Sequence, residues 1–248
     1  MYLLLVTCYL LLQYRNRVNC LNISENIARV HDRIAAASGG RRVWLVAATK
    51  MNGADRVREA VAAGVDACGE NRVQEFLEKD ALGAYAGAPK HFIGHLQSNK
   101  VNKLVGRVDL IQSVDSAELV RAIGRRAASL GLTQDVLIEI SVAGEAQKSG
   151  LPPAELPDLL ALAGETEGIR VRGLMCVPPI LTESGSNRPY FVLMRQLYLD
   201  NGGKKYDNVS MDFLSMGMSD DYAEAVAEGA NMVRIGSAIF GARDYSKA

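Results

Sequence analysis

The sequence lacks an excess of charge of either sign, because its 248 residues contain 28 Lys and Arg against 28 Asp and Glu. A nucleic-acid-binding protein normally carries a clear basic surplus, so this class is disfavoured. The four cysteines are scattered and include no Cys-x-x-Cys pair. Such cysteine usage predicts reduced thiols and a cytoplasmic protein rather than a secreted one. No metal site is predicted.

Long hydrophobic runs are also scarce, and the first one is difficult to place. The apolar stretch from Tyr2 to Leu12 is too short for a transmembrane helix. It resembles the core of a signal peptide, yet no basic residue precedes it and no small-residue cleavage site follows it. Residues 1–21 are therefore either a non-essential extension or a targeting or anchoring segment. Residues 22–248 are predicted to form a single domain without a membrane association.

Short apolar segments are what the chain does contain, and helical patterns separate them. The predicted strands are 43–50, 65–68, 91–93, 108–114, 135–142, 171–177, 208–216 and 232–235. One further helix is expected ahead of the first strand, with Ser24 as its N-cap. Strict alternation predicts parallel strands, and eight such units predict an α/β protein of the (β/α)8, or TIM, barrel class. An open doubly wound sheet is disfavoured because no Gly-x-Gly-x-x-Gly follows the first strand.

Lys50 ends the first predicted strand, where two interpretations are open. The amine can be a solvated strand end, as lysines usually are. It can instead be held against low-dielectric surroundings, where a lowered pKa frees it to form a Schiff base. In a (β/α)8 barrel the active face is built from the carboxyl ends of the strands, so Lys50 lies where chemistry is expected.

The loops after the seventh and eighth strands are the habitual phosphate site of this architecture. Here they are Ser215-Met216-Gly217-Met218-Ser219 and Gly236-Ser237. Glycine lets backbone N–H groups approach an anion, and serine adds hydroxyl donors; ordinary turn chemistry is the alternative. A lysine facing a phosphate site suggests pyridoxal 5′-phosphate (PLP).

Arg234, just before the second of these loops, has two candidate roles. It could face the pyridine nitrogen of PLP, which it would keep unprotonated and so weaken the ring as an electron sink. It could equally pair with a carboxylate at the barrel rim. Spacing alone does not separate the two.

Several longer segments resemble the PLP homeostasis protein family, in order over about residues 23–241. They are Val46–Lys50, Gly69–Glu75, His91–Lys100, Lys148–Gly150, Gly173–Met175, Ser215–Tyr222 and Val233–Gly241.

The resemblance implies a PLP barrel of fold type III, related to the N-terminal domain of alanine racemase, with Lys50 carrying the cofactor as an internal aldimine. It implies that Arg234 faces the pyridine nitrogen and that Asn71 lies beside the ring, near the phenolic oxygen. The phosphate would be held by Ser215, Gly217, Gly236 and Ser237. The family is regarded as lacking robust catalytic activity, so no catalytic residue is assigned.

The leading expectation is a PLP-binding protein of vitamin B6 homeostasis, a monomer that could deliver PLP to apo-enzymes. The alternative is a PLP-dependent amino-acid racemase-like enzyme, which would need a further β-domain and an opposing acid/base for which the sequence leaves no room. A phosphate-binding barrel without PLP is a third possibility. Lys100 and Lys103 lie one turn apart and have two interpretations. They contact a ligand, which is an anion or a second PLP, or they form a solvated face.

Overall fold

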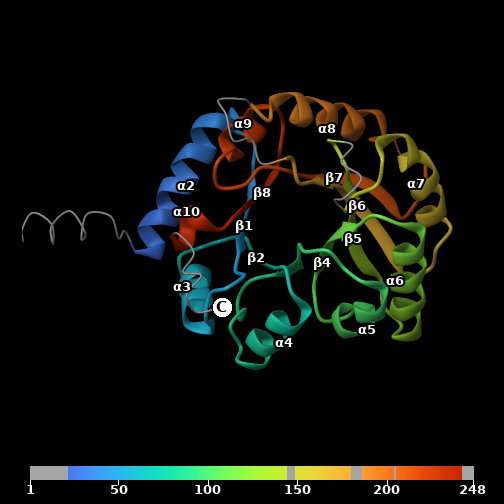
Figure 1. Cartoon of the computed structure of the whole chain (residues 1–248), viewed down its shortest axis with the longest axis horizontal. Coiled ribbons are helices and arrows are strands. Elements are labelled where there is room, and N and C mark those ends of the chain that lie inside the picture. The colour runs from blue at the N-terminus through green and yellow to red at the C-terminus, as the bar shows by residue number, and fades with distance from the viewer. Residues whose placement is uncertain (1–21, 144–148, 180–185, 204, 242–248) are drawn as a thin grey trace, which may run out of the picture.

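The computed structural model describes residues 22–143, 149–179, 186–203 and 205–241. The N-terminal extension, Lys148 and the last seven residues lie outside the described residues. Eight strands form a closed barrel in chain order, each parallel to its neighbours, which confirms the predicted (β/α)8 class (Figure 1). The strands are β1 (Trp44–Ala48), β2 (Ala67–Glu70), β3 (Lys90–Phe92), β4 (Leu110–Val114), β5 (Gln134–Ile140), β6 (Ile169–Cys176), β7 (Val209–Ser215) and β8 (Met232–Ile235).

Helices surround the barrel in a single outer ring (Figure 1). They are α2 (Ile23–Ser38), α3 (Ala54–Ala62), α4 (Val73–Ala81), η1 (Ser98–Lys100), α5 (Val101–Leu104), α6 (Ala117–Ser129), η2 (Pro153–Glu155), α7 (Leu156–Gly164), α8 (Arg188–Asp200), α9 (Tyr222–Ala227) and α10 (Ser237–Phe240). The expected extra helix is α2, which packs against α9 and α10. Among the described helices, none combines the length and the apolar character that a membrane crossing requires.

Two apolar layers hold this arrangement together. The larger lies between the barrel and the helices, and the smaller fills the barrel interior with Val46, Ala67, Leu110, Leu137, Met175 and Met232. Because side chains along a strand alternate between its two faces, every second residue points inward. On β1 the inward series runs through Val46 and Ala48 toward Lys50, and on β8 it runs from Met232 to Arg234. The pleat therefore points Arg234 into the barrel, and its place late in β8 puts it toward the carboxyl end, where Lys50 follows β1.

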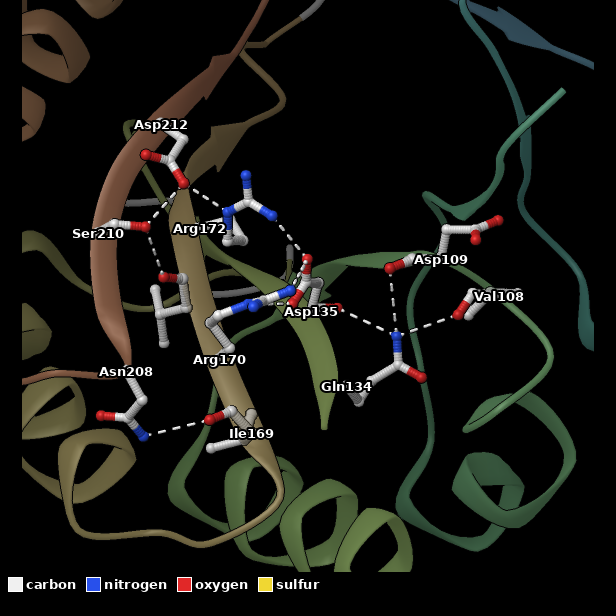
Figure 2. Close-up of polar contacts among 11 residues, drawn as sticks. Val108, Asp109, Gln134, Asp135, Ile169, Arg170, Arg172, Asn208, Ser210 and Asp212 are labelled. Atoms are coloured by element: carbon white, nitrogen blue, oxygen red, sulfur yellow. Dashed lines mark hydrogen bonds and ion pairs between the residues drawn. The ribbon is translucent and has the colours of Figure 1, made fainter. Parts of the chain in front are cut away.

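The opposite part of the barrel is stabilised by charge pairs on β5, β6 and β7 (Figure 2). Asp135 accepts hydrogen bonds from Arg170 Nε at 2.6 Å and from Arg172 Nη1 at 2.7 Å. Arg172 also donates to Asp212, and its guanidinium lies 5.3 Å from the centre of the Phe213 ring. Polar residues near the amino ends of barrel strands generally serve stability, and this cluster fits that rule.

The start of α2 differs from the expectation, because Asn22 rather than Ser24 is the N-cap. Asn22 Oδ1 accepts a hydrogen bond from the Glu25 backbone N–H at 2.8 Å, and Glu25 Oε2 accepts one from the Asn22 N–H at 3.3 Å. This reciprocal pair is a capping box, which satisfies two N–H groups that a helix start otherwise leaves open. The prediction of Ser24 was wrong by two residues.

We therefore expect Asn22→Ala to lower the free energy of unfolding by about 1 kcal/mol, as loss of a good N-cap does. Ser24→Ala is the matched control, because Ser24 is exposed within the same turn, and it should change the free energy by less than about 0.5 kcal/mol. Urea unfolding of the two variants measures both values. Equal losses would contradict the assignment of the cap.

Candidate functional site

Lys50 lies two residues beyond the end of β1, at the carboxyl end of the barrel, and is half-buried. The chain turns sharply here, because Met51 adopts φ +61°, a left-handed conformation that side chains other than glycine rarely take. Asn52 Nδ2 donates to the Lys50 carbonyl at 3.1 Å. Glu75 Oε1 accepts from the Met51 N–H at 2.5 Å. The turn that presents the Lys50 amine is thus held by side-chain contacts.

A buried cation lies directly behind this turn. Lys79 Nζ, on α4, donates to the Thr49 carbonyl, to Glu70 Oε2 and to Glu75 Oε1, each at 2.7 Å. The Lys79 side chain is 7% exposed and that of Glu70 is 1% exposed, so water competes little for these bonds. Lys79 therefore bonds directly to Thr49, the residue before Lys50. Through Glu75 it also holds Met51, the residue after Lys50.

Glu70 completes this cluster from the end of β2. Its carboxylate also accepts from Thr49 Oγ1 at 2.9 Å and from the Tyr85 hydroxyl at 3.3 Å. Burial raises the pKa of Glu70, and the attraction of the Lys79 ammonium opposes that rise. This cluster was not predicted from the sequence, although the spacing of Glu75 and Lys79, four residues apart on one helix, is a recognisable signal.

Arg234 lies inside the barrel in a chain of neutral partners. Its Nη1 donates to Ser215 Oγ at 2.6 Å and its Nη2 to the Cys176 carbonyl at 2.7 Å. Ser215 Oγ in turn donates to Gln112 Oε1 at 2.7 Å, and Gln112 Nε2 lies 3.0 Å from His91 Nδ1. Among the described residues no carboxylate forms an ion pair with Arg234, so the rim ion pair considered above is not present. Ser215 supports Arg234 instead of lying free in its loop.

The two predicted phosphate loops meet at a pair of backbone donors. The N–H groups of Gly236 and Ala238 both donate to Ser219 Oγ, at 3.3 Å and 3.2 Å. Gly217 adopts φ +94°, and a Cβ there would lie 2.6 Å from the Ala225 Cβ, so only glycine fits. Converging N–H groups of this kind suit a phosphate oxygen. Ser219, which the predicted set of site residues omitted, occupies the acceptor position.

Asn71 and Ser113 carry unsatisfied polar atoms near the barrel mouth. Asn71 Oδ1 and Ser113 Oγ are buried without a hydrogen-bond partner among the described residues. The backbone of Asn71 is closely packed, since a Cβ at Gly94 would lie 2.2 Å from the Asn71 carbonyl oxygen. Buried polar atoms are normally paired, so these two are available to a polar ligand. Together with the amine, the N–H pair and the arginine, they fit the functional groups of PLP.

Comparison with known proteins agrees with this chemistry. Residues 18–244 match the family model described as alanine racemase, N-terminal domain. The pyridoxal phosphate homeostasis proteins of Aquifex aeolicus and of Escherichia coli K12 are 41% and 40% identical to the chain; each match covers 91% of this chain and 100% or 99% of the relative. The structure of PipY from Synechococcus elongatus with PLP bound has a TM-score of 0.78 and 33% identity, covering 89% of this chain and all of that one.

Burial lowers the pKa of His91 to about 4 from an ordinary value of 6.5. Between these pH values the unfolded chain binds a proton that the folded chain does not, so folding stability falls as the pH falls. This lowering of the pKa corresponds to a loss of about 3 kcal/mol at most.

We expect His91→Asn to lose less stability than the wild type when the pH is lowered from 6.5 to 4. Urea unfolding at both pH values measures the difference between the two proteins, which removes the contribution of the carboxylates that they share. Identical losses would show that His91 is not buried in its neutral form.

The buried pair should be revealed by a double-mutant cycle. Lys79→Met leaves the Glu70 carboxylate buried without its cation and should lower the free energy of unfolding by about 3 kcal/mol or more. Lys79→Met combined with Glu70→Gln removes both charges and should restore most of that loss. Chemical denaturation of Lys79→Met, of Glu70→Gln alone and of the double variant provides the measurement. A double variant as unstable as Lys79→Met would contradict the pairing.

Proposed function

This chain belongs to the pyridoxal phosphate homeostasis protein family, and we propose that it binds PLP through Lys50 and takes part in the homeostasis of that cofactor. One observation carries the proposal: the turn that presents Lys50 is anchored on both sides by hydrogen bonds at the carboxyl end of the barrel, the one to Thr49 buried and the one to Met51 exposed. A merely solvated strand end would not need such anchoring. The names of the relatives, and the PLP in PipY, support the same assignment.

We assign the contacts as follows. The Lys50 amine holds the aldehyde carbon covalently, Arg234 faces the ring nitrogen, and Asn71 borders the ring. The phosphate lies against the loops of Gly217, Gly236 and Ser237, where Ser219 now accepts from two N–H groups. Ser215 holds Arg234 in position rather than contacting the phosphate itself.

These residues favour binding of the cofactor rather than catalytic turnover of a substrate. Bound PLP supplies an electrophilic carbon and a ring that can draw electron density from it. Arg234 is a permanent donor whose guanidinium is already bonded to Ser215 and Cys176, so it does not protonate the ring nitrogen and the electron demand of the ring stays low. We further propose a cytoplasmic monomer that passes PLP to apo-enzymes.

A racemase-like enzyme is the second candidate, favoured by the match to the alanine racemase domain. It would need an acid/base group opposite Lys50. His95, in the loop after β3, is a candidate for this role; it is exposed and its Nδ1 lies 4.0 Å from Asp115 Oδ2. Turnover of D- or L-alanine well above that of Lys50→Ala would favour the enzyme, and turnover equal to it would favour the carrier.

The cofactor assignment is tested by reductive trapping. The protein is incubated with PLP and then reduced with borohydride, which converts the linkage to a stable secondary amine, and intact mass and peptide mapping locate the adduct. We expect one adduct on the Lys50 peptide in the wild type and none in Lys50→Ala. Lys90→Ala is the control, because Lys90 begins β3 at the other end of the barrel, and it should label like the wild type. Adducts scattered over several lysines would contradict the proposal.

A further inference from the structure

A cavity lies between the start of α4 and the segment η1–α5, and it shares Asn71 with the candidate cofactor site. Its volume is about 300 Å³, enough for a small organic molecule. These elements follow one another around the barrel (Figure 1). Asn71, which carries the unpartnered Oδ1, forms one wall, and Phe92 and Val73 supply apolar surface.

The cavity is strongly cationic. Arg72, Lys100 and Lys103 all line it, and none of its described lining residues is acidic. Within the part of the chain that the structure describes, none of these three cations forms an ion pair. The nearby Glu75 is already bonded to Lys79 and to the Met51 N–H. Three unneutralised cations around one hollow favour an anionic ligand.

The backbone adds to this preference. Arg72 is the N-cap of α4, a helix of nine residues, and its side chain forms no cap hydrogen bond. The first N–H groups of a helix lack partners within the helix, and the helix dipole places partial positive charge at this end. Val73 and Gln74, the first two residues of α4, line the cavity, so this end of the helix borders it.

We propose that this cavity binds a small phosphate monoester. The doubly charged phosphate group would lie among Arg72, Lys100 and Lys103, and the organic part would pack on Phe92 and Val73. The proposal is independent of the Lys50 chemistry, because it requires no aldehyde.

Titration calorimetry with pyridoxine 5′-phosphate, which has no aldehyde, tests this site. The protein is first incubated with PLP and reduced, so that any site linked to Lys50 is filled. We expect Lys100→Ala to weaken binding by about tenfold or more, through loss of a charge-assisted hydrogen bond. Arg107→Ala removes one exposed positive charge just beyond α5, outside the cavity, and should bind as the wild type does.

Equal affinity for wild type and Lys100→Ala, or no binding to the wild type, would overturn the proposal. Circular dichroism of each variant shows that it is folded, and Lys103→Ala provides an independent second substitution. Glycerol 3-phosphate distinguishes the sources: affinity equal to that of pyridoxine 5′-phosphate means recognition of the phosphate alone, and weaker affinity means that the vitamin B6 ring is recognised as well. In either case added salt should weaken binding.

Discussion

The buried ammonium of Lys79 is the interaction on which the candidate site depends. It lies between the strands and α4, where three oxygens share it, and one of them is the carbonyl of Thr49. Removing a cation and a carboxylate from water is costly, and the cost is offset only when their geometry is good. The result is a rigid support behind a turn that contains the strained Met51. That support therefore fixes the position of Lys50, which lies between Thr49 and Met51.

The barrel interior shows a second way of holding a charge. Arg234 is buried among neutral acceptors, and burial lowers its pKa, although a guanidinium remains protonated at neutral pH. The hydrogen-bond partners of Arg234 are neutral, while Glu139 and Asp221 attract its charge from a distance without a hydrogen bond. The same polar chain continues through Gln112 to His91, which burial keeps neutral. The Arg234 guanidinium, supported by the neutral side chains of Ser215, Gln112 and His91, suits a binding site for an anionic aromatic ligand.

The fold was largely predictable, and the site was predictable where it follows strand ends. The last strand was predicted with its observed limits, residues 232–235, because a buried strand bounded by polar residues has clear ends. Lys50, Asn71 and the loops after β7 and β8 lie at strand ends as expected, and their contacts with PLP stay a prediction. Long-range pairing was not predictable: Lys79 binds the carbonyl of Thr49, just after β1, and the carboxylate of Glu70, at the end of β2. Ser215 was expected in the phosphate loop, yet its hydroxyl is bonded to Gln112, 103 positions away.

A crystal structure of the protein grown with PLP tests the central claim most directly. The account predicts continuous density from Lys50 Nζ to the cofactor, the ring nitrogen facing Arg234, and the phosphate at the N–H groups of Gly236 and Ala238 in place of Ser219 Oγ. Attachment at another lysine, or a phosphate bound away from the loops after β7 and β8, would contradict it.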